Sequence, residues 1–209
     1  MYKLWIANKN YSSWSLRPWI LLKALNIPFE EKLCYFENGK SSYEKFKQFS
    51  PTGLVPCLID EELIVWDSLA ICEYIAEEYP QVWPVSKTAR AWARSASAEM
   101  HSGFTALRQQ CPMNCKHQAP LDTLSHELQS DLNRLQQLWL YGLNNYGGPW
   151  LAGDKFTAVD AFFAPVALRV NSYQLTINEA AQRWINQIVA LPAMQEWFNA
   201  GVAEPEIDH

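Results

Sequence analysis

The spacing of the apolar residues changes once along the chain, near residue 80, and this change limits the possible folds more than any other feature. Before it, short strand-type apolar runs alternate with stretches whose apolar residues recur every three or four positions. After it, only the helical spacing is found, and the boundary is marked by the segment PQVWPVSK. The sequence therefore predicts a mixed α/β domain over residues 1–80, a linker over 81–87 and an all-helical domain over 88–209.

The first of these domains is predicted to have the element order βαβαββα. The expected strands are residues 2–7, 29–35, 56–59 and 63–66, and the expected helices are residues 15–25, 42–49 and 67–79. A polar turn over residues 60–62 joins the last two strands in a hairpin. We expect a thioredoxin-like arrangement from this order.

The second domain is predicted to contain only helices. Their expected ranges are residues 89–107, 121–138, 157–169, 178–190 and 192–200. Leucines at spacings of three and four mark the second of these helices. A mixed domain followed by a helical one predicts a cleft between the two, where a ligand site is expected.

Charge and composition exclude several classes of partner. The net charge is −5 and no basic run is present, so nucleic acid is not expected as a partner. No segment has the roughly 20 apolar residues of a membrane span, and the first residues do not resemble a signal peptide. Five cysteines, an odd number, agree with a reducing compartment, so we expect a cytoplasmic protein. Cys111, Cys115 and His117 lack a fourth metal ligand, so a loop is expected there and no metal.

The loop after the first predicted strand contains the sequence Asn-Tyr-Ser-Ser-Trp-Ser from Asn10 to Ser15. Its hydroxyls lie at the expected start of a helix, where free N–H groups and the helix dipole favour negative charge. No cysteine occurs before Cys34, which argues against a thiol–disulfide oxidoreductase. Taken alone, the serines are better explained as helix caps than as a catalytic site.

Two further positions join this loop in a candidate binding site. Val55-Pro56 stands where the chain enters a predicted strand, and Asp67-Ser68 opens the following helix. Asp67 and Ser68 have the residue types of helix caps. They also offer a carboxylate, a hydroxyl and free N–H groups to a ligand that resembles an amino acid.

These three positions, in this order over the whole chain, resemble the glutathione transferase family. The resemblance implies that Ser12 or Ser13 is the catalytic hydroxyl and that Val55, before a cis-Pro56, pairs its backbone with the cysteinyl part of glutathione. It also implies that Asp67 and Ser68 hold the γ-glutamyl end. A fourth match, Thr157 to Asp160, resembles the structural capping box of the family.

Within the family, the stretch from Ser12 to Arg17 is similar to the Ser-Ser-Cys-x-x-Arg motif of zeta-class enzymes, which include maleylacetoacetate isomerases. Counting back from Arg17 places Ser12 at the catalytic serine and Ser13 beside it. Trp14 replaces the zeta cysteine, and Leu54 stands where zeta enzymes carry a glutamine. The chain looks closer to a bacterial branch with a Tyr-Ser-Ser-Trp-Ser motif, so isomerase activity is not assumed.

The resemblance implies further contacts and an assembly. Lys40 is a candidate partner for the glycine carboxylate of glutathione, although a solvated lysine is the simpler interpretation. For His101 and Met100, a solvated or core position is the competing interpretation. The residues expected to line the electrophile pocket are Tyr11, Trp14, Met100, His101 and Phe104. A homodimer is also implied.

Two functions remain open after this reasoning. The first is an enzyme that adds glutathione to a small electrophile, or isomerises one with its help. The second is a non-catalytic protein that uses the same fold to carry apolar ligands. Retention of Ser12, Ser13, Val55-Pro56 and Asp67-Ser68 together favours the enzyme.

Overall fold

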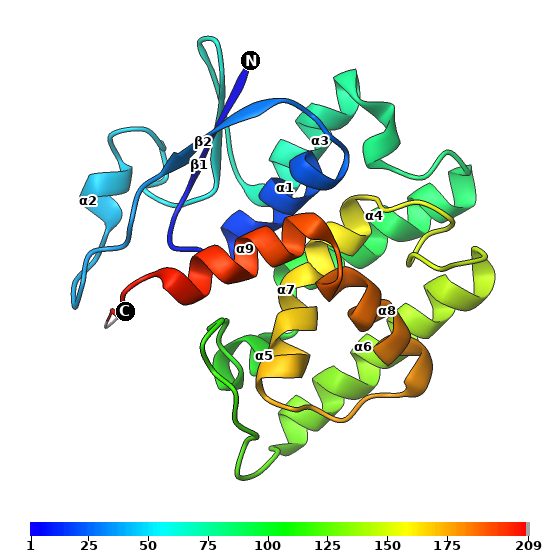
Figure 1. The fold of residues 1–209 in the computed structure, drawn as a ribbon. Helices are drawn as coiled ribbons and strands as arrows, with labels where there is room; N and C mark the ends of the chain where they lie inside the picture. The colour runs from blue at the N-terminus through cyan, green and yellow to red at the C-terminus, as the bar shows by residue number, and fades with distance from the viewer. Residues whose placement is uncertain (208–209) are drawn as a thin grey trace.

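The computed structural model describes residues 1–207, and its N-terminal part is built on a four-stranded sheet (Figure 1). The strand order in space is β2-β1-β3-β4, with β1 and β2 parallel and β3 antiparallel to both β1 and β4. The strands are β1 (Tyr2–Ile6), β2 (Phe29–Leu33), β3 (Cys57–Asp60) and β4 (Leu63–Val65). In β1 alternate residues are buried, as expected for a strand with one face on the core.

Three helices connect or follow these strands and complete the predicted order βαβαββα, which is confirmed. They are α1 (Ser13–Ala24), α2 (Tyr43–Phe46) and α3 (Ser68–Glu78). A short 3-10 helix, η1 (Pro80–Val82), leads out of this thioredoxin-like domain. The hairpin predicted around residues 60–62 is formed by β3 and β4.

The rest of the chain is helical, as predicted. Its helices are α4 (Lys87–Ser102), α5 (Thr105–Gln110), α6 (His126–Asn145), α7 (Ala158–Ser172), α8 (Glu179–Val189) and α9 (Pro192–Ala203). In the part of the chain that the structure describes, no helix is long and apolar enough to cross a bilayer.

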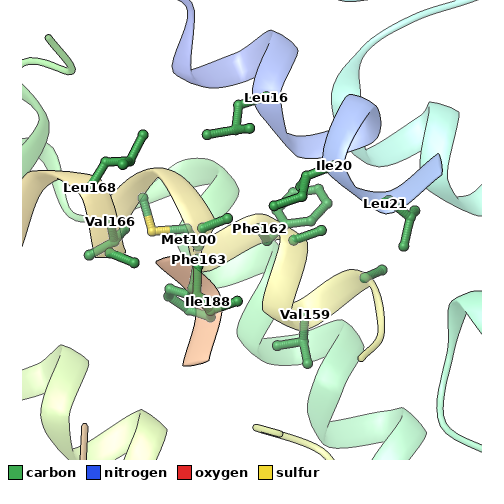
Figure 2. Close-up of a cluster of buried hydrophobic side chains, with 14 of the residues drawn as sticks. Leu16, Ile20, Leu21, Met100, Val159, Phe162, Phe163, Val166, Leu168 and Ile188 are labelled. Atoms are coloured by element: carbon green, nitrogen blue, oxygen red, sulfur yellow. The ribbon is translucent and has the colours of Figure 1, made fainter. Parts of the chain in front are cut away.

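Helix α7 is the centre of the molecule. All of its residues except Asn171 are buried, which is typical of a helix covered on every side. It packs against α1 of the first domain and against α4 and α8 of its own domain. Figure 2 shows Leu16 and Ile20 of α1 directed towards Phe162 of α7. The two domains therefore share one continuous hydrophobic core.

The single helix predicted over residues 89–107 is wrong, because the structure divides it into α4 and α5. Gly103 ends α4, and Phe104 has a left-handed backbone with φ of 54° before α5 begins. The Arg108 guanidinium donates hydrogen bonds to the carbonyls of His101 and Gly103, both at 3.3 Å. These bonds satisfy carbonyls that the end of α4 leaves without partners in the helix.

The starts of α1 and α6 also differ from the expected ones. Helix α1 begins at Ser13 rather than Ser15, so Pro18 lies beyond its first turn. Helix α6 begins at His126 rather than residue 121, because the extended Ser125 caps it by accepting a hydrogen bond from the Leu128 N–H at 3.1 Å. The predicted capping box of Thr157 and Asp160 is confirmed.

Candidate functional site

The loop after β1 is held in place by the other end of the chain. The Glu204 carboxylate, directly after α9, accepts hydrogen bonds from the Lys9 N–H at 2.8 Å and the Asn10 N–H at 3.2 Å. The Asn10 side chain accepts a bond of 2.7 Å from the Cys115 N–H. Two segments far apart in sequence, those of Cys115 and Glu204, therefore fix the loop that leads into α1. Sequence reasoning missed Glu204, because nothing in its local pattern distinguishes it from a surface acid.

Ser12 and Ser13 follow this loop and differ in their surroundings. Ser12 precedes α1, is buried, and its hydroxyl donates to Ser15 Oγ at 2.7 Å. Ser15 Oγ accepts a bond of 3.3 Å from the Ala7 N–H. Ser13 is the first residue of α1 and lines a cavity, and no partner for its hydroxyl is found among the described residues. Of the two serines, Ser13 is therefore the one that lines the cavity.

This cavity has a volume of about 480 Å³ and lies between the domains. Ser13 and the predicted residues Tyr11 and Trp14 line it from the first domain, and the predicted His101 lines it from α4. The structure does not bring Met100 or Phe104 to it. Met100 is fully buried in the core (Figure 2), and the Phe104 ring packs edge-on against Phe163.

A larger cavity of about 680 Å³ lies elsewhere, between the linker around Trp83 and the loop before α7. None of the serines of the active loop lines it, whereas Ser13 lines the smaller cavity; Asp67 lines neither. We therefore place the candidate site in the smaller cavity, where the hydroxyl and the helix N-terminus meet.

Asp67 and Ser68 open α3, and Asp67 connects the two domains. One carboxylate oxygen of Asp67 accepts a bond of 3.0 Å from the Leu69 N–H, which caps the helix. The other lies 3.1 Å from His101 Nε2 on α4. Burial lowers the pKa of His101, although the Asp67 carboxylate opposes this shift. Ser68 is buried, and its hydroxyl has no partner within the part of the chain described.

The other predicted glutathione contacts differ in their setting. The Val55–Pro56 peptide bond is cis, as the resemblance implied. Lys40 lies at the surface, where its ammonium forms an ion pair of 3.1 Å with Glu37. In this structure Lys40 therefore has the solvated position that was the simpler interpretation.

Three arginines that sequence reasoning did not place in the site gather around Trp14 and the cavity. The guanidinium carbons of Arg17 and Arg108 lie 4.1 Å and 4.7 Å from the Trp14 ring centre. Arg169 of α7 lines the cavity beside Arg108. Burial lowers the pKa of Arg17 to about 9 and that of Arg169 to about 10. All three remain charged at neutral pH, so this end of the cavity is positive.

Metal-binding groups are not found in this region. Among residues 1–207, no group of three or more His, Cys, Asp or Glu side chains is placed to hold a metal ion. Cys111 and Cys115 are both buried, and the Cys115 thiol donates to the Lys9 carbonyl at 3.6 Å.

Comparison with known families matches both halves of the chain. Residues 11–78 match the family model "Glutathione S-transferase, N-terminal domain", and residues 90–200 match "Glutathione S-transferase, C-terminal domain". Glutathione S-transferase GstB of Escherichia coli (strain K12) is 30% identical over 94% of this chain and 97% of its own. A probable maleylacetoacetate isomerase of Vibrio cholerae is 24% identical over 88% of this chain and 90% of its own.

Solved structures share the same fold. A glutathione transferase homolog from Burkholderia gl BGR1, with bound glutathione, superposes with a TM-score of 0.70 at 23% identity. That match covers 97% of this chain and 99% of the other. Glutathione transferase Omega 3C of Trametes versicolor has a TM-score of 0.69 at 17% identity, over 99% and 90% of the two chains.

Proposed function

Because the chain belongs to the glutathione S-transferase family, we propose that it activates the thiol of glutathione for attack on a small electrophile. The observation that carries this proposal is the place of Ser13, which lines an interdomain cavity at the N-terminus of α1 and whose hydroxyl has no partner among residues 1–207. A thiolate bound there meets both a hydroxyl donor and the positive end of the helix.

Glutathione binds along the edge of the first domain in this proposal. The Asp67 carboxylate receives the ammonium of the γ-glutamyl group, and Ser68 offers its hydroxyl to the carboxylate of that group. The buried and unpartnered Ser68 hydroxyl supports this assignment, since a buried hydroxyl without a partner is costly. Val55, before the cis-Pro56, pairs its backbone with the cysteinyl part. Lys40 reaches the glycine carboxylate only if it leaves Glu37.

The chemistry depends on the ionisation of the bound thiol. A free thiol has a pKa of about 8.5, so only a few per cent is ionised at neutral pH. One hydrogen bond to the charged form contributes about 1.5–3 kcal/mol, which lowers the thiol pKa by roughly one to two units. Arg17 adds a buried positive charge beside Trp14, and this charge favours the thiolate further.

Two serine geometries are compatible with this role. Ser13 is the direct donor, since it already lines the cavity. The resemblance instead favours Ser12, whose hydroxyl is bonded to Ser15. If the Ser15 hydroxyl turns to donate to Ser12, the Ser12 proton is released towards the sulfur, because hydroxyl hydrogens rotate freely. In that case Ser15 orients Ser12 as a positioning residue.

The test is a pH–rate profile with a generic electrophile for Ser12→Ala, Ser13→Ala and Ser15→Ala. If Ser13 is the donor, only Ser13→Ala raises the apparent thiol pKa, by roughly one to two units. If Ser12 is the donor, Ser12→Ala and Ser15→Ala both raise it and Ser13→Ala does not. Three profiles identical to the wild type would refute activation by any of these serines.

Assays on the same enzyme preparation distinguish two alternative functions. Relatives named as probable maleylacetoacetate isomerases, at 26% and 24% identity, favour a glutathione-dependent cis–trans isomerisation as the second candidate. A non-catalytic carrier is the other alternative, and it predicts glutathione binding without turnover of any electrophile.

The assembly, compartment and boundaries belong to the same proposal. A homodimer is supported by the exposed aromatic side chain of Tyr141 on α6. Its ring stacks on that of Trp92 on α4, with the ring centroids 6.2 Å apart. A cytoplasmic location is supported by the five cysteines, all of them free. The domains extend over residues 1–80 and 88–209, with residues 81–87 as the linker.

A further inference from the structure

The cavity beside Ser13 has an unusual charge for this protein. The chain as a whole carries a net charge of −5. The cavity, however, is lined by Arg108, Arg169 and His101. Its described lining contains no aspartate or glutamate. Arg17 lies directly behind the Trp14 wall. Positive charge is therefore concentrated around one interdomain cavity of an acidic molecule.

Among residues 1–207, no carboxylate is paired with Arg17, Arg108 or Arg169. In the described part of the chain, the Arg169 guanidinium makes a single hydrogen bond, from Nε to the Cys111 carbonyl at 2.8 Å. Arg17 is 1% exposed, and its Nε and Nη1 have no partner there. The surface residues Arg94, Arg134 and Arg183 behave differently, since each is paired with a glutamate.

The Asp67 carboxylate favours the charged form of Arg17, but burial and the neighbouring arginines outweigh this effect. Asp67 is committed to the Leu69 N–H and to His101. The arginines also lie close enough to weaken one another, because Arg169 and Arg108 both lower the pKa of Arg17. Buried cations without an anion are costly, and a bound anion offsets that cost.

We infer that the second substrate of this site is an anion: a small electrophile that carries a carboxylate held by Arg108 and Arg169. This inference rests on the proposed function. Arginine suits the task, because its planar guanidinium matches a carboxylate with two parallel hydrogen bonds. The electrophilic carbon then lies on the Ser13 side of the cavity, where the thiolate is expected.

A matched pair of probes isolates the carboxylate. 4-Chloro-3,5-dinitrobenzoate and 4-chloro-3,5-dinitrobenzamide have nearly the same size and differ in charge. In each, a sulfur electron pair of the glutathione thiolate forms the S–C bond, and chloride leaves with the C–Cl bonding pair. The thiol proton goes to solvent, and the carboxylate or amide is unchanged.

The experiment measures kcat/KM for both probes with the full chain and divides each by the rate without enzyme. The wild type is expected to favour the benzoate by roughly ten- to one-hundredfold, the range for a charge-assisted hydrogen-bond pair. Arg108→Gln and Arg169→Gln are expected to bring this ratio close to one. Arg90→Gln is the matched control, because Arg90 bonds only the carbonyls of Pro84 and Val85 among the described residues and lies outside this cavity.

Other outcomes overturn the inference in distinguishable ways. Equal preference in the wild type, with both probes conjugated, removes the anionic substrate and leaves the proposed function intact. A tenfold weaker glutathione affinity in Arg108→Gln, measured by calorimetry, assigns the arginines to glutathione instead. Absence of turnover with both probes overturns the proposed function, and the inference with it. Since Arg169 is buried, its variant counts only if its circular dichroism matches the wild type, and Arg108→Gln then decides.

Discussion

Replacement of Asp160 by alanine is expected to destabilise the protein more than any other single change to the capping box. The buried Asp160 carboxylate accepts bonds from the Leu151 N–H at 2.9 Å, the Thr157 N–H at 3.0 Å and Trp184 Nε1 at 2.9 Å. Alanine leaves three buried N–H groups unpaired, and each costs about 1–3 kcal/mol. Partial relaxation makes these costs less than additive, so we expect a loss of about 3–6 kcal/mol. That is a large share of the typical total stability of about 5–15 kcal/mol.

Urea unfolding at pH 7.5 measures this loss. The matched control is Asp154→Ala, because Asp154 lies in the same segment but is exposed. The loss of stability in Asp160→Asn is expected to lie between those of Asp160→Ala and Asp154→Ala. Asparagine keeps an acceptor for Leu151 and Trp184 but turns an N–H group towards the Thr157 N–H. A loss below 1 kcal/mol for Asp160→Ala, or one equal to that of the control, would refute the reasoning.

The same carboxyl gives a pH dependence with a defined sign. Burial raises the pKa of Asp160 from 3.8 to about 6, and its hydrogen bonds limit the rise. Because the folded state holds the proton more tightly, this contribution is fully present below about pH 4 and is lost as pH rises through about 6. The unfolding free energy of Asp160→Asn is therefore expected to change less between pH 4 and pH 7 than that of the wild type. If the unfolding free energies of the two proteins change in parallel with pH, the raised pKa of Asp160 is contradicted.

Three other measurements test the site and the assembly. Asp67→Asn keeps the helix cap but removes the charge, so glutathione binding is expected to weaken roughly tenfold by calorimetry with little change in stability. An affinity equal to that of the wild type rules out the γ-glutamyl assignment. Glu204→Ala frees the Lys9 and Asn10 N–H groups and is expected to cost about 2–4 kcal/mol in urea; a loss under 0.5 kcal/mol shows that the loop is held by other contacts. Light scattering is expected to give about twice the 24.0 kDa mass of the chain, whereas 24.0 kDa at all concentrations argues for a monomer.

The fold was predictable because its signals are local. The strand-type and helical spacings and the Thr157–Asp160 box each depend on residues close in sequence. The division between α4 and α5 was not predictable, because Met100, Phe104 and Leu107 continue the helical spacing across it. The hydrogen bonds from Arg108 to backbone carbonyls contribute to the end of α4. A sequence pattern does not show these bonds.

The site was predictable only in part, for a similar physical reason. Tyr11, Trp14 and His101 were expected at the pocket, and all three line the cavity. Arg108 and Arg169 are isolated basic residues on separate helices, and along the chain they look like solvated charges. Their meeting beside Trp14 depends on how α5 and α7 pack, which is a tertiary property.

The contact between Glu204 and the active loop has a consequence for the order of synthesis. The loop is synthesised before its anchor, which lies 195 positions later in the chain. Until that anchor is made, the Lys9 and Asn10 N–H groups lack their partner and the start of α1 lacks its support. A nascent or prematurely released chain therefore holds every serine of the site without the geometry to use them. In the proposed mechanism, thiol activation therefore requires that synthesis of the chain has reached Glu204.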